Sequence, residues 1–124
     1  MGNLKTLFDT SVLTGSGNDR TPRLEGDCAV SVVTIGELHA GVLLASHGPA
    51  QAMRLQRLSD VLSLAVVLDV TRSVAVAYGE LRMATGRAPA NDLWIAATAI
   101  AHDLELVTAD KGQASLPYLT AQLV

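Results

Sequence analysis

Four acidic residues stand beside apolar segments that are far apart in the chain: Asp9, Glu37, Asp92 and Asp110. Three of them follow short apolar runs with the composition of buried strands, and the fourth opens a helix-like stretch. In an open parallel α/β sheet, the ends of the strands and the starts of the helices meet at one crevice. Carboxylates gathered in this way repel one another, and Mg2+ or Mn2+, which prefer oxygen ligands, would relieve the repulsion. The sequence therefore predicts an acidic pocket that holds a divalent cation.

The elements that must position these acids alternate along the chain. Strands are expected at residues 4–8, 29–33, 64–68 and 104–108, with a fifth at 119–123. Helices are expected at residues 34–46, 50–62, 71–86 and 91–102, and the Gly-, Ser- and Pro-containing segment 14–27 has loop chemistry. This alternation favours one domain over residues 1–124: a three-layer α/β/α sandwich whose central, mostly parallel sheet has four to five strands.

The composition sets limits on the environment of the protein. Of its 124 residues, 49% are hydrophobic and 3% are aromatic, so Ala, Val, Leu and Ile must build the core. The net charge of −3 argues against a general nucleic-acid coat, but it does not exclude a nuclease with an acidic site. Cys28 is the single cysteine, which suits a reducing compartment, and we expect it to be buried. No apolar run approaches the roughly 18 residues of a membrane span, so we expect a cytoplasmic protein without membrane contact.

Each acid also has a purely structural interpretation. Glu37 lies three residues after Thr34, and the two could form a capping box. Asp92 falls in the first turn of a helix, where the dipole favours a carboxylate by roughly 0.3–1 kcal/mol, and Asn91 could be the cap. The two remaining acids could be ordinary turn formers. Singly, no acid distinguishes these alternatives, and their shared placement at one sheet edge favours the pocket.

The segments that carry the acids resemble the motifs of PIN-domain ribonucleases. They are FDTSVL at 8–13, SVVTIGEL at 31–38, NDLWIAATA at 91–99 and LVTAD at 106–110. The third motif is the most specific. The order, the spacing and the total length are similar to those of VapC-type toxins of bacterial toxin–antitoxin pairs, and the resemblance covers essentially the whole chain.

The resemblance implies an endoribonuclease that hydrolyses RNA phosphodiesters with a water activated by Mg2+ or Mn2+. It also implies a homodimer that is inhibited by a small VapB-like antitoxin. The metal ligands and catalytic groups would be Asp9, Glu37, Asp92 and Asp110. The residues that orient those carboxylates would be Thr10, Ser11, Asn91 and Thr108.

Two departures from the family pattern are visible. Residues 15–27 have loop character where members usually carry a helix, so Arg20 and Arg23 either contact RNA or antitoxin from this segment or only solvate it. A second acid that is common just after the fourth motif is missing, since Lys111, Gly112 and Gln113 stand there. With one acid fewer, the binding of a second metal ion would be weaker.

Two other functions are compatible with an acidic α/β domain. The first is a catalytically inactive PIN-fold binding module, against which the presence of all four acids argues. The second is a phospho-receiver-like signalling domain, which needs paired acids at the first strand and an acceptor after a central one. Asp9 stands alone, and Asp69 is the only acceptor candidate, so the nuclease is the favoured interpretation.

Overall fold

The computed structural model of the chain describes residues 3–14, 24 and 27–124. Its centre is a five-stranded sheet in the order β3-β2-β1-β4-β5, and all four neighbouring pairs are parallel. The strands are β1 (Thr6–Phe8), β2 (Cys28–Ser31), β3 (Val66–Leu68), β4 (Glu105–Thr108) and β5 (Ala121–Leu123). The predicted parallel sheet is confirmed, although each strand is shorter than the apolar run that indicated it.

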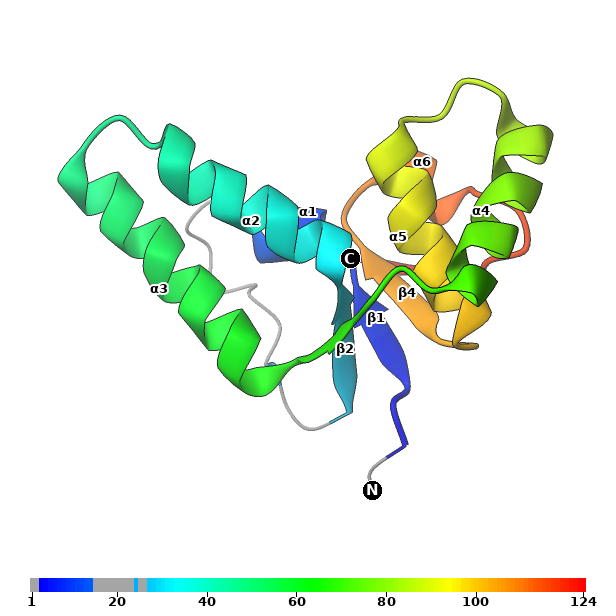
Figure 1. Cartoon of the computed structure of the whole chain (residues 1–124), viewed down its shortest axis with the longest axis horizontal. Coiled ribbons are helices and arrows are strands. Elements are labelled where there is room, and N and C mark those ends of the chain that lie inside the picture. Colours follow the sequence, from blue (N-terminus) through cyan, green and yellow to red (C-terminus); the bar gives the residue numbers. More distant parts are fainter. Residues whose placement is uncertain (1–2, 15–23, 25–26) are drawn as a thin grey trace.

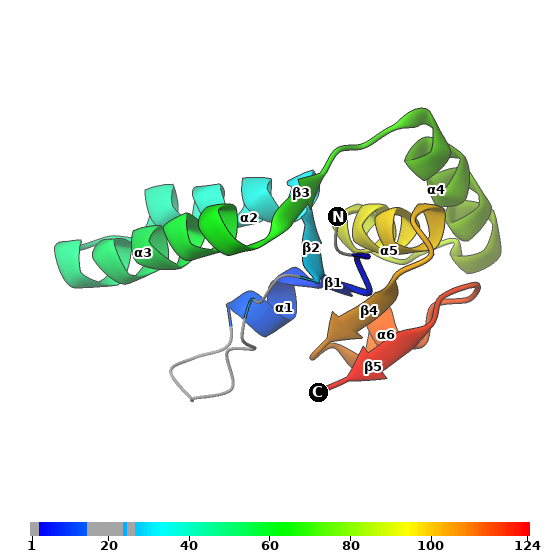
Figure 2. The same ribbon diagram turned by 90° about the horizontal axis from the view of Figure 1, so that it is seen from below.

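Helices cover both faces of this sheet, as predicted. The helices α2 (Val32–Leu44) and α3 (Gly48–Leu64) lie on one side of the strands, and α4 (Arg72–Thr85) and α5 (Ala90–Ala101) lie on the other (Figures 1 and 2). Two one-turn helices complete the fold: α1 (Thr10–Leu13) follows β1, and α6 (Lys111–Ala114) follows β4. Within the described part of the chain, no helix is long and apolar enough to cross a membrane.

The alternation of side chains along the strands divides the core between the two faces. Phe8 of β1 packs with Leu38 of α2 and Val61 of α3 in one cluster. Its neighbour Leu7 points to the opposite face and packs with Ile95 of α5. Cys28 is buried in the first of these clusters as expected, and burial raises the pKa of its thiol.

A third cluster joins α4 to α5. The small residues Ala96 and Ala97 of α5 pack against the buried face of α4, so the two helices lie in close contact. Tyr78 and Trp94 stack with their ring centroids 3.8 Å apart, and the Arg82 guanidinium lies 5.5 Å from the Tyr78 ring centre. These aromatic side chains therefore contribute to the packing of α4 against α5.

Two details of the predicted helices are wrong. Thr34 does not cap α2, because the helix begins at Val32 and the Ser31 hydroxyl accepts the Val33 N–H at 3.0 Å. The expected bounds of the next helix, 50–62, are too narrow, since α3 runs from Gly48 to Leu64; along it Leu55 is 53% and Leu62 is 52% exposed, whereas Leu58 is buried. Spacing alone located a helix in this segment, but it did not show which of its leucines meet the sheet.

Candidate active site

Asp9 lies directly after β1 and is only 4% exposed. Its Oδ2 accepts hydrogen bonds from the hydroxyls of Ser11 at 2.6 Å and Thr108 at 2.9 Å. Each hydroxyl has one hydrogen, and the carboxylate can only accept, so the 3.2 Å contact between these hydroxyls has no proton left for it. Both hydroxyls accept backbone N–H groups in turn, from Ala109 at 3.0 Å and from Asp110 at 3.1 Å. The turn after β4 thus fixes the orientation of Asp9.

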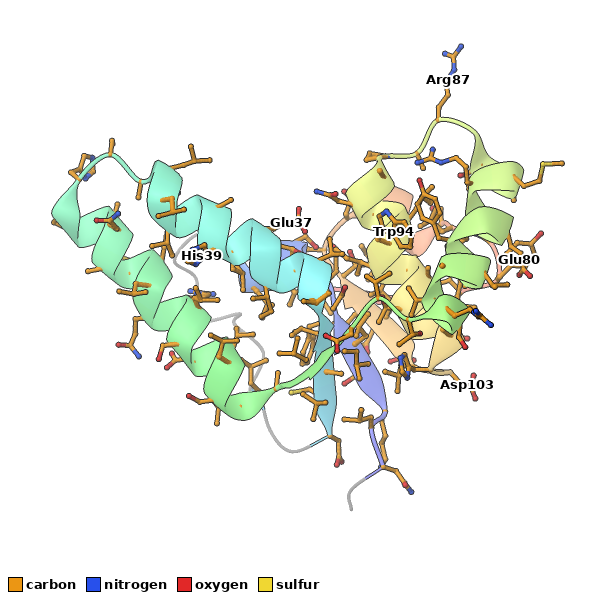
Figure 3. The ribbon with its side chains drawn as sticks, viewed as in Figure 1. Glu37, His39, Glu80, Arg87, Trp94 and Asp103 are labelled. Atoms are coloured by element: carbon orange, nitrogen blue, oxygen red, sulfur yellow. The ribbon has the colours of Figure 1, made fainter. Side chains whose placement is uncertain are left out.

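Glu37 projects from α2 toward α1 and the start of α5 (Figure 3). Its Oε1 accepts the Thr10 hydroxyl at 2.7 Å, and its Oε2 lies 3.5 Å from the Asn91 side-chain nitrogen. Thr10 also lies 3.0 Å from the Thr34 hydroxyl. Thr10 is the donor in this contact too, so its single proton is shared between the nearer Glu37 carboxylate and the Thr34 hydroxyl. The alternative capping-box interpretation of Glu37 is wrong, since Ser31 caps the helix.

Asp110 follows β4 and caps α6. Its Oδ1 accepts the backbone N–H groups of Gly112 at 2.8 Å and Gln113 at 3.2 Å. A Cβ atom on Gly112 would lie 3.2 Å from this same oxygen, so the glycine permits the close approach. The structural interpretation of Asp110 as a turn former is therefore correct, and it leaves the second carboxylate oxygen outside this capping interaction.

Asp92 lies half-buried in the first turn of α5. Burial raises the pKa of its carboxyl, and the charges of Asp9, Asp110 and Glu37 raise it further, in that order. None of these causes is a cation. The structure therefore brings all four predicted acids into one electrostatic neighbourhood, at the carboxyl ends of β1 and β4 and the start of α5.

The carboxylates of Asp9, Glu37, Asp92 and Asp110 form what is called the acidic edge from here on. Their oxygen atoms suit a hydrated divalent cation. Among residues 3–14, 24 and 27–124, no three His, Cys, Asp or Glu side chains form a group that could hold an ion together. Mg2+ keeps several of its waters and is commonly bound through one or two carboxylates and a substrate phosphate, so it does not require a closed protein cage. All four candidates offer oxygen atoms, and after burial the charges of the other three carboxylates raise the pKa of Asp92.

The other residues that the sequence singled out have different outcomes. Thr10, Ser11, Asn91 and Thr108 all contact a candidate carboxylate, and their role in orienting metal ligands stays a prediction. Arg20 and Arg23 lie outside the described residues, and their contacts stay a prediction. The sequence indicated Thr34 only as a helix cap and Gln113 only as one of the residues after the fourth motif, and it predicted neither the burial nor the observed contacts of these side chains.

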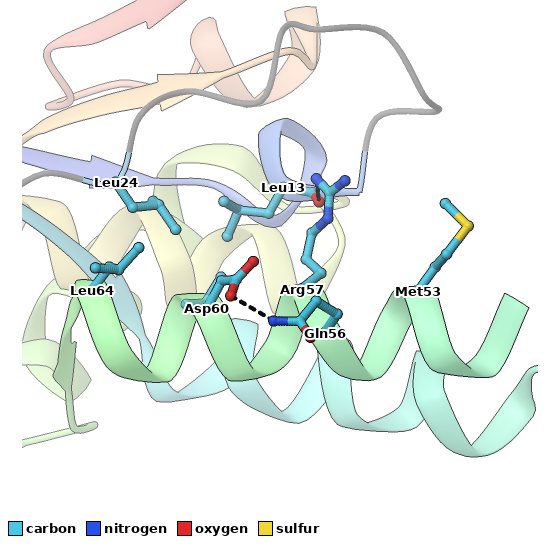
Figure 4. A pocket seen from close by; sticks show the side chains of 8 residues that line it. Leu13, Leu24, Met53, Gln56, Arg57, Asp60 and Leu64 are labelled. Atoms are coloured by element: carbon cyan, nitrogen blue, oxygen red, sulfur yellow. Dashed lines mark hydrogen bonds between the residues drawn. The ribbon is translucent and has the colours of Figure 1, made fainter. Parts of the chain in front are cut away.

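A separate cavity of about 380 Å³ lies between α1 and α3 (Figure 4). It is lined by the apolar side chains of Leu13, Leu24 and Met53, and none of the four acids lines it. Arg57 of α3 donates from Nη1 to the Leu13 carbonyl at 2.6 Å, and this bond connects the end of α1 to α3.

The parallel α/β sandwich and its acidic edge define the class of protein. Residues 6–117 match the model of the PIN domain family. This match includes all four segments that resembled PIN-domain motifs and decides against the phospho-receiver alternative.

Relatives with known names narrow the class. The chain is 41% identical over 119 residues to ribonuclease VapC4 of Mycobacterium tuberculosis, which covers 91% of this chain and 92% of that protein. It is 38% identical over 116 residues to ribonuclease VapC5 of the same organism, with 89% and 86% covered. The crystal structure of VapBC-5, a toxin–antitoxin system of M. tuberculosis, superposes with a TM-score of 0.82 at 32% identity, covering 97% of this chain and 98% of that one. The chain belongs to the VapC-type branch of the PIN domain family.

Proposed function

We propose that this chain is the endoribonuclease toxin of a toxin–antitoxin pair and that it hydrolyses RNA phosphodiester bonds at the acidic edge. The observation that carries the proposal is the convergence of four carboxylates from four sequence segments: Asp9, Asp110 and Glu37 lie near enough to Asp92 to raise its pKa beyond the effect of burial. The names of the two M. tuberculosis relatives support the reaction class.

We assign Asp9, Glu37, Asp92 and Asp110 as the groups that hold Mg2+ or Mn2+. When bound, such an ion activates water and neutralises the charge that develops on the phosphate. The chain's own residues prepare this site. Hydroxyls fix Asp9 and Glu37 before any ion binds, and the N–H groups of α6 fix one oxygen of Asp110. Such preorganisation of ligands is worth about 10–100-fold in metal affinity or activity.

The attacking group distinguishes this mechanism from other ribonuclease chemistry. Water as the nucleophile leaves a 5′-phosphate and a 3′-hydroxyl on the cleaved RNA. Attack by the ribose 2′-hydroxyl would instead leave a 2′,3′-cyclic phosphate, and that product would contradict the proposal.

The test is cleavage of RNA with Mg2+ or Mn2+, with and without EDTA, by the wild-type chain and by Asp9→Asn. The wild-type chain should cut only with metal and should leave the ends described above, and the variant should fold normally without cutting. Absence of metal-dependent cutting by the wild-type chain would favour the inactive binding module. If the wild-type chain does cut, mapping the cut ends across total RNA would define the substrate.

We further propose a VapB-like antitoxin and a second copy of the chain as partners, in the cytoplasm. The structurally similar VapBC-5 is a member of a toxin–antitoxin family, which supports this assignment. Large apolar side chains stand exposed on α2 and α3, among them Leu43, Leu44, Met53 and Leu55. Exposed apolar patches on a small domain mark interaction surfaces. RNA or antitoxin contacts by Arg20 and Arg23 remain part of this proposal.

A further inference from the structure

Gln113 of α6 connects two of the candidate metal ligands. The residue is 2% exposed. Its side-chain Nε2 donates to the backbone carbonyl of Asp92 at 2.8 Å, and its backbone N–H donates to Asp110 Oδ1 at 3.2 Å. We propose that Gln113 is a positioning residue that sets the separation of Asp92 and Asp110, an inference that rests on the proposed function.

The amide at this position is costly for the fold. Its Oε1 is buried and has no hydrogen-bond partner among the described residues. A buried acceptor without a partner costs about 1–3 kcal/mol, whereas an apolar side chain of similar size would avoid that cost. Turning the amide over would bring Oε1 against the Asp92 carbonyl, so only the observed orientation makes the bond.

The side-chain amide of Gln113 connects two separate elements, α5 and α6. Asp92 belongs to α5, and Asp110 precedes the single turn of α6. A helix of one turn has little stability of its own, so its position depends on tertiary contacts. Gln113 holds this turn to the start of α5 while its N–H holds the Asp110 carboxylate. The buried Oε1, without a partner in the described part of the chain, departs from the rule that buried polar atoms are hydrogen-bonded. Such departures are typical of functional sites.

The experiment compares the wild-type chain with Gln113→Met, which fills a similar volume without polar atoms. Binding of Mn2+ is measured by isothermal titration calorimetry, and thermal unfolding is measured without metal. We expect the Mn2+ dissociation constant to rise about tenfold, the range seen when groups that orient metal ligands are lost. The melting temperature should stay the same or rise, because the unpartnered oxygen is gone.

Unchanged Mn2+ affinity in Gln113→Met would overturn the inference, whatever happens to stability. If the variant loses both affinity and stability, Val61→Ala is the matched control, since Val61 is buried in α3, away from both acids. Equal loss of Mn2+ affinity in that control at equal loss of stability would also overturn the inference. Full Mn2+ affinity in the control would support it. A wild-type chain that binds no Mn2+ would instead refute the proposed metal site itself.

Discussion

Removal of the Thr108 hydroxyl tests how much its hydrogen bond to Asp9 contributes to the stability of the fold and to RNA cleavage. Thr108→Val replaces a hydroxyl with a methyl group of nearly the same size at a position that is fully buried. The change removes the 2.9 Å bond to Asp9 Oδ2 and the 3.1 Å acceptor of the Asp110 N–H. A hydrogen bond to a charged group contributes about 1.5–3 kcal/mol and a neutral one about 0.5–1.5 kcal/mol, so we expect a loss of roughly 2–4 kcal/mol.

The matched control is Thr108→Ser, which keeps the hydroxyl and loses only the methyl group. Burial of one such group is worth about 0.8 kcal/mol, so the serine variant should lie close to the wild-type chain. Urea unfolding of the three proteins gives the free energies of unfolding. The difference between the wild-type chain and the valine variant reports the loss of the hydroxyl, and the serine variant reports the loss of the methyl group alone. RNA cleavage should fall about 10–100-fold in the valine variant, because Asp9 is no longer held in one orientation, and should largely persist in the serine variant.

Equal urea midpoints for the valine variant and the wild-type chain would refute the expected contribution of the hydroxyl. Such a result would mean that Ser11 alone satisfies Asp9 Oδ2, and that the Thr108 contact contributes nothing measurable. Cleavage at the wild-type rate by the valine variant would separately refute the claim that this bond prepares the site.

The same acidic edge allows three further predictions. Asp92→Asn should abolish cleavage, and the metal-free variant should be at least as stable as the wild-type chain at neutral pH. The folded pKa of Asp92 is raised, so its contribution to stability is present below the unfolded pKa and is lost as pH rises through the folded pKa. Thermal melts at pH 4 and pH 7 should therefore show a larger gain from this variant at pH 7, and an equal gain would contradict the assignment. Thr10→Val should lower cleavage about 10–100-fold through loss of the 2.7 Å bond to Glu37, and Thr10→Ser should restore most of it. Addition of Mg2+ at 100 times its dissociation constant should stabilise the wild-type chain by about 2.7 kcal/mol, EDTA should reverse the effect, and a melting temperature insensitive to both would refute metal binding.

The architecture was predictable because local signals and the sheet agree. Short apolar runs located all five strands, and the residues at helix ends act as expected in α4. Its cap Thr71 accepts the Val74 N–H at 3.3 Å, and Gly86 ends the helix with a φ of +68°, which glycine adopts without strain. The gathering of the four acids followed from the carboxyl-edge rule once the strands were known to be parallel. Their role as metal ligands stays a prediction.

The contacts that hold the acids were only partly predictable. Thr10 donates to Thr34, which lies 24 residues away, as well as to Glu37, and Gln113 reaches Asp92 across 21 residues. Neither pairing has a local signature, because it depends on how α1 meets α2 and how α6 meets α5. The helices α1 and α6 have four residues each, too few for a periodic pattern, and were not predicted.

The electrostatic cost of the acidic edge is concentrated at Asp92. This residue lies in the first turn of α5, where the helix dipole favours a negative charge by roughly 0.3–1 kcal/mol. Burial, and after it the charges of three neighbouring carboxylates, nevertheless raise its pKa, so burial and repulsion together outweigh the effect of the dipole. Asp9, by contrast, is more deeply buried but accepts two hydroxyl bonds. The least supported carboxylate is therefore the one whose charge a bound cation would stabilise most, which makes Asp92 the position where metal binding and stability of the fold are most strongly coupled.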